Sequence, residues 1–223
     1  MDLISPLEPS LKGHTHSFKS LTQSLKDDLR IKYTPTPLNK LRYTCEAIPF
    51  DLVPFGGIEK SGEVSIPPSY DSLMNVTGYD DALRCAITYS VDDKKIKIAS
   101  PEMLVSLKLV AWDENPARDR DASDIFYLMK NYEHIDPDAY TYILDNYGEV
   151  LEYFNHETTL SHVALLGIRL SNYINYANVD MINKILRDEN KKERFIRGMQ
   201  PEKTELEHEY EYIKAFLYGL NYE

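Results

Sequence analysis

The chain has 223 residues, 43% of them apolar and 27% charged, so it can bury a real core as one large domain or two small ones. Its formal net charge of -11 argues against a broad electropositive surface for gripping nucleic acid. No stretch approaches the roughly 18 uninterrupted apolar residues of a membrane span, and the first residues lack the pattern of a secretory signal. We therefore expect a cytoplasmic protein with no membrane partner, in which Cys45 and Cys85 are reduced thiols.

The first half of the chain has the pattern of a mixed α/β unit. Apolar residues recur every three or four positions over 16–30, which predicts an amphipathic helix. Period-two alternation then predicts a pair of strands, 41–47 and 50–55, joined by a tight connection at 48–49. Further short strands are expected at 63–66, 84–90 and 95–99.

Helical spacing dominates the second half. Ser100, Pro101 and Glu102 supply a capping hydroxyl, a ring preset for the first helical turn and an acid near the positive end of the helix dipole. Another helix is expected to begin at Asp121. Later helices are predicted over 138–154, 158–175, 179–188, 191–199 and 203–219. The chain from about residue 136 is thus expected to form a helical bundle, with its many tyrosines at helix contacts.

One lysine and two aspartates in the middle of the chain are candidates for chemistry. Lys108 lies beside the apolar face of the helix that follows Pro101, and Asp121 and Asp124 are neighbours on the next helix. A short connection predicts a helical hairpin that brings the three together. Structurally, they form an ion-pair network with Asp121 as an N-cap; functionally, Lys108 with Arg118 and Arg120 forms a cationic shelf for a polyphosphate.

The stretch 51–59, "DLVPFGGIE", has the same two interpretations. Asp51 either pairs with an arginine such as Arg42 or, as one of several carboxylates, holds Mg²⁺. Gly56 and Gly57 most simply supply a sharp turn with positive φ, and their alternative role is close backbone approach to a nucleotide.

Several motifs, in order along the chain, carry a resemblance to a known family. They are "FDLVPFGGIE", "SIPP", "MNVTGYDDAL", "KIKIASPEMLVSLKLVAWDENPARDRDASDIFYLMKNY", "ALLGIRLSN" and "FLYGLN". Together they resemble the predicted nucleotidyltransferases of the AbiEii-like group, which includes toxins of type IV toxin–antitoxin systems. The similarity runs from about Leu41 to the end of the chain.

This resemblance implies a mixed α+β fold, with a small nucleotidyltransferase-type sheet flanked by helices over 1–135 and a helical bundle over 136–223. It assigns Asp51 to a divalent metal, Mg²⁺ or Mn²⁺. It assigns Lys108, Asp121 and Asp124 to the triphosphate of an NTP and to the active-site network. The implied partners are a nucleotide, an RNA or protein acceptor, and an antitoxin or other protein.

The sequence also departs from the family pattern. The family's opening D-x-D motif is absent, and Asp2 stands about where its second carboxylate would fall, so Asp2 is the proposed second metal ligand. Asn115 replaces an arginine that the group often has, and Arg118 or Arg120 would take over that role. Two functions follow: transfer of a nucleoside monophosphate from an NTP to a hydroxyl, or a catalytically silent relative that binds a partner protein.

Overall fold

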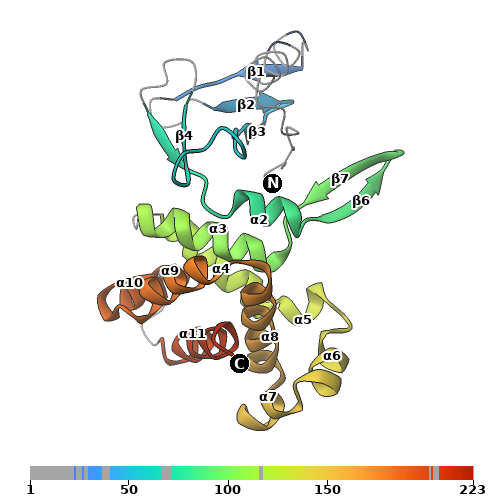
Figure 1. The fold of residues 1–223 in the computed structure, drawn as a ribbon, viewed down its shortest axis with the longest axis vertical. Coiled ribbons are helices and arrows are strands. Elements are labelled where there is room, and N and C mark those ends of the chain that lie inside the picture. Colours follow the sequence, from blue (N-terminus) through green and yellow to red (C-terminus); the bar gives the residue numbers. More distant parts are fainter. Residues whose placement is uncertain are drawn as a thin grey trace. The chain divides into compact units, whose positions relative to one another are not determined.

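A computed structural model describes residues 30–36, 41–66, 72–115, 118–200 and 206–222, together with Gln23, Asp27 and Glu202. The chain divides into two compact units, Met1–Ala99 and Ser100–Glu223 (Figure 1). The domain boundary expected between residues 135 and 136 therefore falls inside the second unit. The expected helix over 16–30 and the proposed ligand Asp2 lie outside the described residues.

The first unit contains a three-stranded antiparallel sheet in the order β1-β2-β3. Its strands are β1 (Ile31–Tyr33), β2 (Arg42–Cys45) and β3 (Ile48–Asp51). The predicted hairpin of β2 and β3 is confirmed, but its turn is not at 48–49. Glu46 and Ala47 make the turn instead, with φ of 48° and 72°, and Ile48 and Pro49 already belong to β3.

Two further strand pairs and one short helix complete the described part of this unit. The pairs are β4 (Glu63–Ser65) with β5 (Leu73–Asn75), and β6 (Ile87–Val91) with β7 (Lys94–Ile98). The helix α2 (Tyr79–Arg84) precedes β6 and occupies the start of the strand expected at 84–90. Within the described ranges the strands form three separate antiparallel sheets, and Leu41, Val64, Ile66 and Val76 form a small hydrophobic core.

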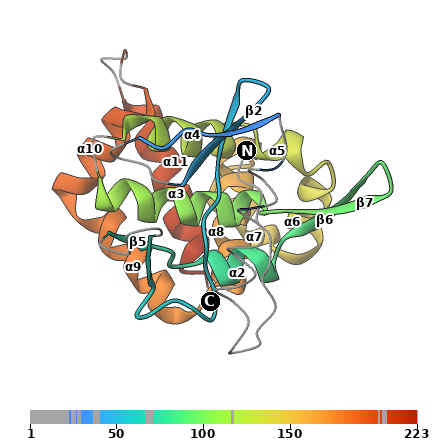
Figure 2. The same ribbon diagram turned by 90° about the horizontal axis from the view of Figure 1, so that it is seen from above.

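The second unit begins with two helices that lie side by side, α3 (Pro101–Glu114) and α4 (Asp119–Lys130) (Figure 2). The predicted start of α3 is confirmed: the Ser100 hydroxyl accepts a hydrogen bond of 3.4 Å from the backbone N–H of Met103. The helix α4 begins two residues before the expected Asp121, which therefore lies in the first turn and is not an N-cap.

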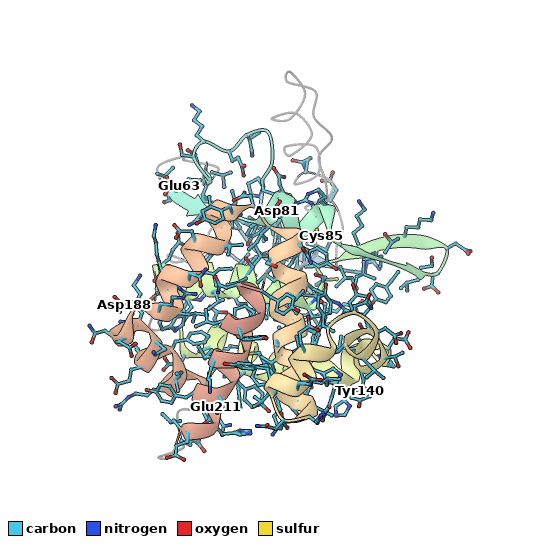
Figure 3. The ribbon with its side chains drawn as sticks, turned by 60° about the horizontal axis from the view of Figure 1, so that its bottom comes forward. Glu63, Asp81, Cys85, Tyr140, Asp188 and Glu211 are labelled. Carbon is cyan, nitrogen blue, oxygen red and sulfur yellow. The ribbon has the colours of Figure 1, made fainter. Side chains whose placement is uncertain are left out.

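In the described part of the second unit seven more helices follow, and most agree with the spacing of apolar residues. They are α5 (Tyr132–Ile135), α6 (Ala139–Asn146), α7 (Gly148–Tyr153), α8 (Thr158–Tyr173), α9 (Tyr176–Arg187), α10 (Glu189–Met199) and α11 (Glu207–Leu220). The single helix expected over 138–154 is two, because Tyr147 leaves the helical region with φ of -143° and ψ of 44°. Asp188, labelled in Figure 3, ends α9 and caps α10 by accepting from the N–H of Lys191.

Two glycines allow α8 and α11 to approach each other closely. A Cβ atom at Gly167 would collide with the carbonyl of Phe216, and one at Gly219 would collide with the carbonyl of Ala164. These glycines belong to the motifs "ALLGIRLSN" and "FLYGLN", so the two motifs meet at one helix crossing. A side chain at either position would have to push the backbones apart.

The fold is mixed α+β, with small antiparallel sheets in the first unit and a helical second unit, as expected. The tyrosines on the helices include exposed ones, such as Tyr140 on α6, labelled in Figure 3 and 44% exposed. Tyr212, by contrast, is buried and packs edge-to-face on Phe126. No helix in the described part of the chain has the length and apolar character needed to cross a membrane.

Candidate functional site

Lys108 lies at the centre of a charged cluster between α3 and α4. Its ammonium is 2.7 Å from Oδ2 of Asp124 and 3.2 Å from Oδ1 of Asp121. The second oxygen of Asp121 is 2.6 Å from Nε of Arg118. The helical hairpin thus brings together Lys108, Asp121 and Asp124, as the sequence predicted, and Arg118 joins them through Asp121. We call these four residues the Lys108 cluster.

The members of the Lys108 cluster differ in burial. The Asp121 side chain is 6% exposed and depends on the two cations for its charge balance, because an unpaired buried carboxylate is costly. Lys108 is 28% exposed, and Asp124 and Arg118 are 41% and 54% exposed. The cluster is therefore anchored at Asp121 and open to solvent at its other members.

The increase in exposure from Asp121 to the other members determines what the Lys108 cluster can do chemically. A phosphate oxygen reaching Lys108 from solvent could replace the carboxylate of Asp124, while Asp121 keeps the ammonium in place. Arg118 presents further donors at the same side of Asp121, although its Nε already serves that carboxylate. Arg120, near the start of α4, is exposed and forms no ion pair with another described residue.

Asp51 has a strong partner within its own sheet. It is the last residue of β3 and faces Arg42 of β2 in the strand register. Both its oxygens accept, at 2.9 Å each, from Nε and Nη2 of Arg42, the two-pronged geometry that suits a guanidinium and a carboxylate. The hydrogen bond and the charge of Asp51 raise the pKa of Arg42. Of the two interpretations of Asp51, the pairing with Arg42 is the one present here.

The same pairing bears on the expected metal. A carboxylate is the donor type that Mg²⁺ and Mn²⁺ prefer, but each oxygen of Asp51 already accepts a hydrogen bond from Arg42, so an ion there would compete with the guanidinium for the carboxylate. Among the described residues, no three His, Cys, Asp or Glu side chains gather as a metal site. Asp51 belongs to the first unit and the Lys108 cluster to the second.

The two glycines after Asp51 behave differently from each other. Gly56 has a φ of 88°, and its carbonyl accepts a hydrogen bond from the N–H of Glu59, so it makes the predicted turn. Gly57 does not have positive φ, and a Cβ there would meet nothing within 4 Å. The turn stands beside Asp80, whose charge adds to burial in raising the pKa of Glu59. Only Gly56 therefore requires glycine for its backbone conformation.

A buried polar network elsewhere in the helical unit was not anticipated from the sequence. The Tyr132 hydroxyl donates to the buried carboxylate of Glu102, and Arg169 donates to the Tyr132 oxygen at 2.9 Å and to Asp136 at 2.6 Å. Burial and the nearby Glu102 raise the pKa of Tyr132. These residues come from α3, from α5 and the residue directly after it, and from α8, so the network ties three segments together.

The position of Glu102 gave the only sequence signal for this network. An acidic residue in the first turn of a helix interacts favourably with the helix dipole whichever way its side chain points, and such a side chain normally faces solvent. Here it is 4% exposed, so its partners are obligatory. Because Tyr132 is 30 residues away in the chain, and Arg169 another 37, no local spacing links the three.

Comparison of the chain with protein-family models, with curated proteins and with solved structures found no match.

Proposed function

We propose that this chain is a nucleotidyltransferase-superfamily protein that transfers a nucleoside monophosphate from an NTP to a hydroxyl group. The acceptor is RNA, protein or a small molecule, and a toxin-like role within a toxin–antitoxin pair belongs to the same proposal. The observation that carries it is the contact of Lys108 with both Asp121 and Asp124 in a cluster open to solvent. These are the residues that the family resemblance assigns to the triphosphate and to the active-site network.

In this proposal the residues have separate tasks. Lys108, with Arg118 and Arg120, neutralises charge on the phosphates, which is most of what phosphoryl-transfer chemistry asks of a protein. Asp121 fixes the lysine, and Asp124 yields it to the nucleotide. Asp51 and Asp2 would hold Mg²⁺ or Mn²⁺, which supplies further neutralisation of phosphate charge when bound. Gly56 and Gly57 would allow the backbone near Asp51 to approach the nucleotide.

The alternative is a catalytically silent relative whose helical unit binds a partner protein. The observation that favours it is the complete engagement of Asp51 by Arg42, together with the two carboxylates already paired with Lys108. Ion pairs of this kind hold neighbouring elements together without any ligand. The two functions therefore differ in one measurable property, which is whether the Lys108 cluster accepts a polyphosphate.

Two measurements separate the functions. The first is binding of fluorescent ATP, GTP, CTP and UTP analogues by anisotropy, with Mg²⁺ or Mn²⁺. The second is transfer of label from [α-³²P]NTPs to RNA, to protein or to the chain itself. The enzyme proposal expects both signals in the wild type. It expects Lys108→Met to weaken NTP binding by about tenfold or more, because the variant keeps the aliphatic stem and loses the charge.

Lys184→Met is the matched control for this experiment. Lys184 is an exposed helical lysine on α9 that pairs with Asp180 four residues earlier, so the variant has the same change of charge outside the cluster. Asp51→Asn should abolish label transfer while leaving NTP binding largely in place. If the folded wild type neither binds nor transfers any of the four nucleotides, the enzyme proposal is rejected in favour of the silent relative.

A further inference from the structure

The hairpin of β6 and β7 has a regular geometry that fixes the direction of every side chain. Its five residue pairs run from Ile87 opposite Ile98 to Val91 opposite Lys94. Asp92 and Asp93 connect the strands, with φ of 47° and 63°, the two positive values of a type I′ turn. In Figure 1 the hairpin extends beyond α2 as a two-stranded ribbon.

The turn also fixes which backbone groups of β6 lie on its outer edge. With a two-residue loop, Val91 and Lys94 exchange both backbone hydrogen bonds, and such pairs alternate along the ladder. Tyr89 therefore bonds to β7, whereas the N–H and C=O groups of Thr88 and Ser90 point outward. In the described part of the chain this sheet contains only β6 and β7, and every residue of β6 is exposed.

The two edges of the hairpin differ in chemistry. The strand β7 reads KKIKI, and its three lysines are the kind of charge that protects a sheet edge from pairing with another strand. The strand β6 reads ITYSV and has no charged residue. Ile87, Tyr89 and Val91 share one face and are 42%, 49% and 50% exposed. The chain thus leaves one edge uncharged, apolar on one face and rich in hydroxyls on the other.

The strand β6 is also complementary to itself. If two copies align antiparallel about Tyr89, each Ile87 faces the other copy's Val91 and each Thr88 faces the other copy's Ser90. The outward backbone groups of Thr88 and Ser90 are then in register for four hydrogen bonds. Tyr89 meets its own copy at the two-fold axis, an aromatic pair of the type that stabilises antiparallel strands.

We propose that β6 is a docking edge for a second copy of this chain, forming a two-fold dimer with a continuous four-stranded sheet in the order β7-β6-β6-β7. This arrangement removes the exposed edge of a two-stranded hairpin, which is only marginally stable by itself. It places the lysines of both copies on the outer strands, away from each other. The inference does not depend on the proposed enzymatic function.

The small contact and the net charge predict how the dimer behaves. A five-residue strand pairing buries less than the standard interface area, so association is weak and reversible. Each copy has a net charge of -11, and screening by salt reduces their repulsion. Sedimentation velocity from low to high micromolar concentration should therefore show a monomer–dimer equilibrium that shifts toward dimer as salt increases.

Charge variants at Tyr89 test the two-fold register. Tyr89→Lys and Tyr89→Glu each place like charges opposite one another at the two-fold axis. The dissociation constant of the dimer should therefore rise by about tenfold or more in each variant alone. A mixture of the two variants should regain it as a heterodimer, because the charges are then opposite. A dimer that persists in both single variants, or a mixture that stays monomeric, overturns the proposal.

Proline variants test the edge itself. Ser90→Pro removes an outward N–H of β6, and Lys95→Pro removes the outward N–H of the residue opposite it on β7. Only Ser90→Pro should abolish the dimer, and circular dichroism verifies that both variants fold. Equal loss in both variants overturns the edge assignment. A wild type that is monomeric at every concentration and salt level overturns the proposal as a whole.

Discussion

The two units of the chain bury their apolar side chains in different ways. In the described part of the first unit, Leu41, Val64, Ile66 and Val76 form a small core near β4 and β5, and the hairpin of β6 and β7 is largely exposed. In the second unit, long helices cover one another, and large residues such as Trp112, Phe195 and Phe216 are completely buried. Stability should therefore reside mainly in the helical unit, and surface for interaction in the strand-rich one.

The largest effect is expected where α8 and α11 cross. Gly219→Ala places a Cβ against the carbonyl of Ala164, so the two helices must separate. The free energy of unfolding of the helical unit should fall by more than about 3 kcal/mol. Urea denaturation followed by Trp112 fluorescence measures this, since Trp112 is the single tryptophan and lies in the same unit.

Gly148→Ala is the control for this substitution. Gly148 is the first residue of α7, and a Cβ there would meet nothing within 4 Å. The change to alanine should leave stability unchanged or raise it by up to about 1 kcal/mol. If Gly219→Ala were as well tolerated as Gly148→Ala, the close crossing would not be a source of the helical unit's stability.

The next largest effect is expected in the Lys108 cluster. Asp121→Asn removes a buried charge that balances Lys108 and Arg118, and it should cost about 2 to 3 kcal/mol of unfolding free energy. Asp124→Asn removes a carboxylate that is 41% exposed, so it should cost less than about 1 kcal/mol. Urea denaturation of both variants gives the two losses of unfolding free energy and therefore their ratio. Equal costs would contradict the gradient of burial within the cluster.

A smaller, pH-dependent effect is expected at Tyr132. Its pKa is raised above the ordinary 10.0 by burial and by Glu102, so the unfolded chain loses this proton before the folded one does. Stability should therefore be fully present below pH 10 and fall by about 1.4 kcal/mol per pH unit above it. Denaturation between about pH 10 and 11.5 should show a shallower fall for Tyr132→Phe, and identical slopes would contradict the assignment.

The smallest expected change, an unshifted Trp112 transition when the first unit is destabilised, tests whether the two cores are separate. Val64 lies in the small core of the first unit and is 1% exposed. Val64→Ala should destabilise that unit by about 2 kcal/mol and speed amide hydrogen exchange over residues 41–66. The Trp112 transition in the helical unit should keep its midpoint. A clear shift of that midpoint would show that the two units unfold together.

Features set by neighbouring residues were the predictable ones. The cap at Ser100 depends on residues three apart, and the contacts of Lys108 with Asp121 and Asp124 follow from one short hairpin and a spacing of three on a helix. The helix α2 was missed because Gly78 precedes it with positive φ and provides no side-chain cap to mark its start. The break at Tyr147 was missed because the apolar period continues through it.

In the candidate site, too, contacts between residues close in the sequence were predictable and contacts between distant residues were not. The Lys108 cluster was predictable because its members lie on adjacent helices joined by a few residues. The buried carboxylate of Glu102 was not, because its partners come from α5 and α8, and their meeting depends on how the helices pack. At Asp51 the sequence left two partners open, and the strand register, which places Arg42 directly opposite, selects one of them.

The placement of the tryptophan and the two cysteines suits the protein to energy-transfer measurements between its two units. Its only tryptophan, Trp112, is buried against Phe195 in the helical unit, with ring centroids 5.0 Å apart, whereas both cysteines, Cys45 and Cys85, belong to the strand-rich unit and are partly accessible. An acceptor dye on either thiol would receive excitation energy from one known donor. Variants in which one cysteine at a time is replaced by serine can therefore test for movement between the units when a nucleotide is added or the protein concentration is raised.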